Sequence, residues 1–159
     1  MKQVFALFAI LIIIILAVVI SQNYLQTSNF NNVNTNSKIP TATINNHAFK
    51  LDIEITEKEK QIGLSQLKTL SQDHGMLFQF ENPAYYPFWT KNMKFPIDII
   101  FIKNGHIVTI YKDAMPPKTP NENLPVYNSK EPADTVLEIN AGLSEKYNFK
   151  EGDEVKLSL

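Results

Sequence analysis

The clearest pattern in the chain is a strict alternation of apolar and polar residues between positions 49 and 56. A period of two places the apolar side chains on one face of a β-strand and the polar side chains on the other. The segment is therefore predicted to be a strand with one face in water. Its apolar members are Phe49, Leu51, Ile53 and Ile55, and its polar members are Lys50, Asp52, Glu54 and Thr56.

Shorter apolar runs predict further strands downstream. The run at 97–102 is interrupted only by Asp98, which is typical of a strand covered on both faces. Asn104-Gly105 follows this run, and that dipeptide favours a two-residue hairpin turn. The remaining predicted strands are residues 75–80, 88–92, 106–111, 135–140 and 155–159.

Little helix is expected. Thr56 and Glu59 have the spacing of a capping box and Gly63 suggests an end, so one short helix is predicted over residues 57–64. A second short helix or turn is predicted near residues 143–147. Six or seven strands with one or two short helices indicate a mainly β domain, either a compact β-sandwich or a partly closed barrel.

A proline-rich segment separates the predicted hairpin from the last strands. Five of the nine prolines fall within residues 115–132, and proline disfavours both helices and central strands. Loops of this length are uncommon in compact domains and often serve as lids or binding loops. We therefore expect a flap here, whose role the sequence leaves open.

The N-terminal part of the chain has a different character. Residues 4–20 form an unbroken apolar run without charge, at the short end of the roughly 17–25 residues that cross a bilayer. A transmembrane anchor is predicted over residues 1–21, with a cleaved signal peptide as the alternative. Lys2 favours a cytosolic N-terminus. Both interpretations place the remainder on the extracytoplasmic side, either anchored to the cell membrane or secreted.

A polar tether and a single domain are expected beyond the anchor. Of the 18 residues from 21 to 38, 13 are Asn, Gln, Ser or Thr, a composition that favours a flexible segment. Residues 22–38 are therefore predicted to be an Asn-rich tether, and residues 39–159 a single β-rich domain. That domain contains 13 lysines and 16 acidic residues, which give it a formal charge of −3.

The composition argues against several classes of partner and cofactor. The chain contains no arginine, and nucleic-acid binders generally present a basic face, so nucleic acid is not expected as a partner. The absence of cysteine excludes disulfides, thiol catalysis and thiolate metal sites. His47, His74 and His106 lack the short spacing of zinc ligands. No metal ion and no other cofactor is predicted.

The most informative stretch runs from residue 88 to residue 98. On a strand, Trp89 and Lys91 share one face while Asn92 lies on the other. Asp98 stands inside an apolar strand, and a buried carboxylate needs a partner such as Lys91, Asn92 or backbone donors. Two interpretations stay open. Asp98 is either a buried polar tie or part of a polar pocket floor with Trp89 as an apolar wall.

Glu138 is a further candidate, because it lies between Leu137 and Ile139 and must point away from that apolar pair. It is either an ordinary solvent-facing acid or a member of the same site. The candidate ligand-binding residues are therefore Trp89, Lys91, Asn92, Asp98 and Glu138. An aromatic cluster nearby fits either core packing or a surface for sugar rings; its members are Tyr85, Tyr86, Phe88 and Trp89.

Ordered motifs across the domain resemble the bacterial and archaeal family catalogued as domain of unknown function 192. The resemblance covers residues 46–159 and implies a compact mainly β fold, in a family whose members often carry export signals. Thr90 and Met93 depart from the family's usual Met after Trp and Thr after Asn. The motifs are Gly63-Leu64, Gly75 to Phe78, Phe88-Trp89 with Lys91-Asn92, Pro96 to Phe101, Gly105 with Ile107-Val108, Leu137 to Gly142, and Gly152-Asp153.

Three hypotheses for function follow from these observations. The leading one is a non-catalytic extracytoplasmic domain that binds a small polar ligand, such as a saccharide, or an envelope partner. The rival is a hydrolase or lyase acting on envelope polymers, with Asp98 and Glu138 as acid and base, which requires both carboxylates to face one cleft. The third is a structural subunit of a membrane complex, which predicts an exposed apolar patch.

Overall fold

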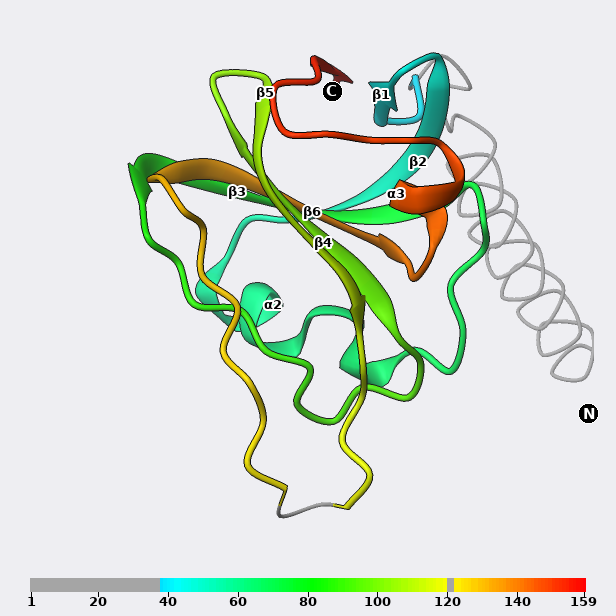
Figure 1. Ribbon diagram of the computed structural model, residues 1–159, viewed down its shortest axis with the longest axis vertical. Coiled ribbons are helices and arrows are strands. Elements are labelled where there is room, and N and C mark those ends of the chain that lie inside the picture. The colour runs from blue at the N-terminus through cyan, green and yellow to red at the C-terminus, as the bar shows by residue number, and fades with distance from the viewer. Residues whose placement is uncertain (1–37, 120–121) are drawn as a thin grey trace, which may run out of the picture. The chain divides into compact units, whose positions relative to one another are not determined.

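Within residues 38–119 and 122–159, which the computed structural model describes, seven strands pair into one mixed sheet in the order β5-β4-β6-β3-β2-β1-β7 (Figure 1). Neighbouring strands are antiparallel except β2 and β3, which are parallel. The strands are β1 (Thr41–Ile44), β2 (His47–Glu54), β3 (His74–Ala84), β4 (Ile97–Lys103), β5 (His106–Ala114), β6 (Ala133–Asn140) and β7 (Val155–Ser158). The helices are α2 (Glu57–Ile62), the 3₁₀ helix η1 (Gly63–Gln66) and α3 (Leu143–Lys146).

The sheet curls until its two edge strands meet at one end. His106 at the start of β5 forms an isolated antiparallel bridge with Glu154, just before β7. Backbone hydrogen bonds from the Ile107 amide to Asp153 (3.0 Å) and from the Val155 amide to Gly105 (2.8 Å) extend this contact. The domain is therefore a half-barrel. This architecture confirms the predicted partly closed barrel. The alternative of a β-sandwich is wrong, because one continuous sheet, and not two packed sheets, carries both apolar clusters.

Two apolar clusters lie on the opposite faces of the sheet. The inner cluster draws on all seven strands and on α3, with Phe49, Ile100 and Leu137 among its fully buried members. The outer cluster lies under η1 and the loop of residues 85–96, and includes Phe78 and Phe101. β4 and β6 contribute alternate residues to both clusters, as the continuously apolar run at 97–102 predicted.

Most local predictions are confirmed. The capping box forms, since the Thr56 side chain accepts from the Glu59 amide and the Glu59 carboxylate accepts from the Thr56 amide. Asn104 and Gly105 form the hairpin turn with φ values of 50° and 73°, as the primed turns require. The predicted strand at 88–92 is wrong, because the segment forms only one isolated bridge, between Phe88 and Tyr127. β1 was not predicted.

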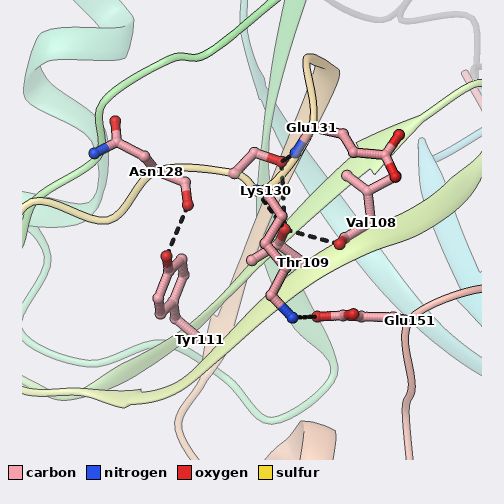
Figure 2. A network of polar contacts seen from close by, with 8 residues as sticks. Val108, Thr109, Tyr111, Asn128, Lys130, Glu131 and Glu151 are labelled. Carbon is pink, nitrogen blue, oxygen red and sulfur yellow. Dashed lines mark hydrogen bonds and ion pairs between the residues drawn. The ribbon is translucent and has the colours of Figure 1, made fainter.

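The proline-rich segment 115–132 contains no helix or strand among its described residues and extends beyond the sheet at the lower end of the view (Figure 1). Its returning leg is bound to β5 by polar contacts (Figure 2). The Tyr111 hydroxyl donates to the Asn128 carbonyl (2.7 Å), and the Thr109 hydroxyl accepts from the Lys130 amide (2.9 Å). These contacts fix the position at which this leg leaves the sheet.

Asp98 ties β4 to two other parts of the inner face. Its Oδ1 atom accepts from the backbone amides of Asp113 (3.0 Å) and Gly142 (3.1 Å), and its Oδ2 atom accepts from the amide of Ser144 (2.8 Å). Gly142, the residue that precedes α3, supplies no side-chain cap, so Asp98 caps this helix from a distant strand. The fully buried side chain is thus satisfied entirely by backbone donors. Of the two interpretations of Asp98, the buried polar tie is the one that agrees with these contacts.

The predicted anchor at residues 1–21 and the predicted tether at 22–38, except Lys38, fall outside the described residues. Among residues 38–119 and 122–159, no helix is long and apolar enough to cross a membrane.

We predict that Asp98→Ala destabilises the domain severely. The substitution leaves three amides without their acceptor, and each buried unsatisfied donor costs about 1–3 kcal/mol, so the free energy of unfolding should fall by about 3 kcal/mol or more. Urea unfolding followed by circular dichroism measures this change. Glu145→Ala on the exposed face of α3 is the control, with an expected change below about 0.5 kcal/mol. Equal stability of the two variants would contradict the role of Asp98.

Candidate functional site

A pocket of about 240 Å³ opens on the outer face of the sheet. Residues of β3 and β6 contribute to its base, α2 and η1 form one side, and the loop 85–96 forms the other. The aromatic residues that line it are Phe78, Phe80, Tyr86, Phe88 and Trp89, and the charged residues are Glu57, Lys60, Lys91 and Glu138. The pocket therefore combines an apolar ring-lined interior with a few charged groups, as small-molecule sites commonly do.

Glu138 is the unusual member of this lining. Its partners in the sheet are Met76 on β3 and Ile99 on β4, so apolar side chains flank it on both sides. The residue is only 4% exposed, and no hydrogen bond or charge from a described residue acts on its carboxyl group. Burial raises the pKa of Glu138 from 4.5 to about 8. Around neutral pH this carboxyl is largely protonated and can donate as well as accept a hydrogen bond.

The wall formed by α2 is anchored beside the pocket. Leu64 in η1 is fully buried in the outer cluster, which holds the helix against the sheet. Lys60 reaches over the ring of Phe80, with its Nζ atom 4.4 Å from the ring centroid, and pairs with Glu57 (3.2 Å). One aromatic face of the pocket therefore already carries an ammonium group, which is an ordinary cation–π contact.

The opposite wall, the loop 85–96, is held by contacts at several points. Phe88 exchanges two backbone hydrogen bonds with Tyr127 (3.0 and 2.8 Å), and its ring packs edge-on against Phe78 (5.1 Å between centroids). The fully buried Thr90 donates its hydroxyl to the Met115 carbonyl (2.7 Å). Rings fixed in this way lose little conformational entropy when a ligand binds.

The structure brings together three of the five predicted site residues. Trp89, Lys91 and Glu138 line the same pocket. Trp89 and Lys91 also line an adjacent hollow of about 420 Å³, together with Asn92 and residues of the proline-rich segment. Asn92 adopts a φ of 61°, a left-handed conformation in which Asn is common. The backbone conformation at this position is therefore a second reason, besides ligand binding, for an asparagine here. Asp98 lies apart from the other four.

The pairing of β4 with β6 separates the two candidate carboxyl groups. Asp98 is opposite Ile139 and Ile99 is opposite Glu138, and directly paired residues point to the same face of a sheet. Asp98 therefore points into the inner face and Glu138 into the outer face. An acid–base pair must share one cleft, so the hypothesis of a hydrolase or lyase using Asp98 and Glu138 is wrong.

The contribution of α2 to the pocket was not predicted. The sequence pattern indicates the helix but not that Lys60 and Leu64 form a pocket wall, because the partner of a short helix is set by tertiary packing. For the same reason the interpretation of Glu138 as a solvent-facing acid is wrong, since its face is covered.

In the described part of the chain, no group of three or more His, Asp or Glu side chains is arranged to hold a metal ion.

Comparison with known families identifies the family of this domain. The sequence profile of the family DUF192, described as "Uncharacterized ACR", matches residues 40–157. The chain belongs to the DUF192 family. The predicted resemblance to domain of unknown function 192 is therefore confirmed. Among curated proteins, none matches this sequence.

Two solved structures resemble this DUF192 domain. A protein of unknown function from Novosphingobium aromaticivorans is 30% identical, with a TM-score of 0.66, and the match covers 74% of this chain and 83% of that chain. A Sinorhizobium meliloti protein described as a candidate transcription regulator is 28% identical, with a TM-score of 0.66, and the match covers 74% and 91% of the two chains.

We predict that Glu138 makes the domain less stable as the pH rises. Its pKa is about 8 in the folded state against an ordinary 4.5, so between these values the folded state binds a proton that the unfolded chain has lost. The free energy of unfolding should fall across this window, with a contribution of up to about 1.4 kcal/mol per pH unit. Below pH 4.5 and above pH 8 the contribution of Glu138 no longer changes.

Glu138→Gln isolates this contribution, because every other titrating group is common to both proteins. Urea unfolding between pH 5 and pH 8 should show the wild-type protein losing stability relative to Glu138→Gln, and the variant should be the more stable of the two at pH 8. Parallel stability curves across this range would show that Glu138 titrates normally.

Proposed function

We propose that this DUF192 domain is a non-catalytic binding module for a small ligand with one ring and polar substituents. The observation that carries the proposal is the buried Glu138 carboxyl, which faces a preformed aromatic pocket without a partner among the described residues. A buried polar group without a hydrogen bond is costly. A ligand that satisfies this carboxyl removes that cost, and the fixed rings give the ligand an apolar surface.

The size of the pocket limits the ligand. A cavity of roughly 150 Å³ holds a benzene molecule, so about 240 Å³ suits a single ring with short substituents. A sugar ring belongs to this class, because its C–H faces pack on aromatic side chains and its hydroxyls bond to a carboxyl group. A longer ligand would extend over Trp89 and Lys91 into the adjacent hollow.

Binding rather than catalysis is favoured by the surroundings of Glu138. Glu57, the other acidic residue of the lining, is 84% exposed in its side chain and pairs with Lys60. The described lining therefore offers Glu138 no second buried carboxyl with which to form an acid–base pair of the usual kind.

We predict that ring compounds change the fluorescence of Trp89. It is the only tryptophan of the chain and lies at 45% exposure in the pocket wall, so its emission reports occupation of the pocket directly. Glucose, glucosamine and cyclohexanol are suitable probes for titration. At least one of them should shift the emission in a saturable way.

A matched pair of variants distinguishes the pocket from the loop surface. Trp89→Ala should weaken binding about tenfold, measured by thermal shift or NMR titration. Tyr85→Ala removes an exposed aromatic residue of the same loop that does not line the pocket, and it should leave the affinity unchanged. The absence of a saturable response to every probe, or equal losses in both variants, would contradict the proposed function.

We also propose that the N-terminal segment holds this module on the outer side of the cell membrane. The support is the uncharged apolar run of residues 4–20 and the Asn-rich stretch that follows it. The full-length protein should sediment with membranes, resist a high-salt wash and dissolve in detergent. Protease added to intact cells or spheroplasts should degrade the domain.

The double variant Ile12→Lys with Ile15→Lys should abolish this membrane association, because each lysine costs about 3 kcal/mol at the centre of a membrane helix. A secreted product shortened at its N-terminus would favour the signal-peptide alternative. Full-length protein free in the cytosol would refute the proposed location and leave the pocket proposal standing.

An envelope protein remains the alternative partner. Trp89 and Val126 are exposed at 45% and 54% and both line the adjacent hollow, so a small apolar surface is available there. A partner that covered this surface would compete with ring compounds for Trp89.

A further inference from the structure

The chemistry at the base of the pocket distinguishes between classes of ligand. Asp98 and Glu138 are both buried, but Asp98 accepts three backbone hydrogen bonds, whereas Glu138 receives none from the described residues. The main-chain amides around Glu138 form the hydrogen bonds of the sheet, because β6 pairs with a strand on each side. Only a group that enters through the pocket can serve as its partner.

A cation can form the strongest hydrogen bond with such a carboxyl group. A neutral hydroxyl leaves the acid protonated and forms one ordinary hydrogen bond. An ammonium group converts the acid to a carboxylate and forms a charge-assisted hydrogen bond with it, which is roughly twice as strong as a neutral one. In surroundings shielded from water, the Coulomb attraction is also screened less than at the surface.

The walls favour a cation as well. Aromatic faces attract ammonium groups, and the half-exposed ring of Trp89 in the pocket lining offers one. The ring of Phe80 is already covered by the Nζ atom of Lys60 (4.4 Å) and by the stacked ring of Tyr86 (3.6 Å). The charge of Lys60 is offset by Glu57, with which it pairs (3.2 Å). Lys91 is exposed, so solvent screens its repulsion of an arriving cation. The titratable or charged groups that share the pocket with Glu138 are therefore Glu57, Lys60, Tyr86 and Lys91.

We infer that the ligand carries a primary ammonium group on a single small ring, with the ammonium bound to the Glu138 carboxylate and the ring packed against Trp89. This inference rests on the proposed function of the pocket. Amino sugars and arylalkylamines both belong to this class. On binding, Glu138 gives its proton to solvent and its carboxylate pairs with the ammonium, so uptake of one cation releases about one proton near neutral pH.

Matched pairs of probes test the inference on the full-length protein in detergent. 2-Phenylethylamine and 2-phenylethanol differ only in ammonium against hydroxyl, and glucosamine and glucose provide the same comparison on a sugar ring. Isothermal titration calorimetry at pH 7 should show the amine of at least one pair binding about tenfold more tightly than its partner. The heat should also vary with the ionisation enthalpy of the buffer, as release of a proton requires.

Glu138→Gln should abolish the preference for the amine while changing the affinity for the neutral partner by less than about threefold. Circular dichroism establishes that the variant is folded, and Glu145→Gln, the same substitution on the opposite side of the sheet, should keep the preference. If only the phenylethyl compounds show the preference for the amine, the ring of the ligand is aromatic; if only the sugars show it, the ring is a sugar.

Two other results would overturn the inference. Equal or tighter binding of the neutral partners, or an amine preference that survives in Glu138→Gln, would show that Glu138 does not select a cation, while the pocket would remain a binding site. Failure of all four probes to bind at millimolar concentration would remove the inference together with the proposed function.

Discussion

The register of β6 between β3 and β4 is the constraint on which the site depends. Because the side-chain period of a strand is two, this register sends Leu137 and Ile139 into the inner core and Glu138 to the outer face. A slip of one residue would turn the acid into the half-barrel and move the apolar pair to the outer face. The pairing that stabilises the core therefore also fixes a carboxyl group at the base of the aromatic pocket.

The domain contains two buried carboxyl groups that differ in their environment. Asp98 lies where β4, the end of β5 and the start of α3 converge, and three amides satisfy it. Glu138 lies in the middle of a strand that is paired on both edges, so apolar side chains surround it and its pKa rises to about 8. The first group stabilises the fold, and the second costs stability at neutral pH. Glu138 lines the aromatic pocket, whereas Asp98 is used up in backbone contacts, and the function is therefore assigned to Glu138.

Local signals in the sequence predicted much of the fold. The apolar run at 97–102, the Asn104-Gly105 turn and the capping box at Thr56 each depend on neighbouring residues, and the structure has all three. Residues 88–91 keep the predicted alternation, with Thr90 buried and Trp89 and Lys91 exposed. They still form no strand, because pairing requires a partner edge and only Tyr127 provides one.

The site was only partly predictable. Trp89, Lys91 and Glu138 were among the candidates, but their meeting in one pocket depends on contacts between distant segments. The parallel pairing of β2 with β3 places the intervening α2 and η1 over the outer face, and no local pattern encodes that crossover. Asp98 and Glu138 each looked like an acid within an apolar strand, and only the pairing of β4 with β6 separates their roles.

The most direct test of the central claim is an NMR titration of the Glu138 side-chain carboxyl carbon in the ligand-free protein, assigned with the help of Glu138→Gln. An unpaired, desolvated carboxyl should titrate with a pKa of about 8. Titration near the ordinary value of 4.5 would show that water or an unrecognised donor satisfies the group, and the case for a ligand at this position would be lost.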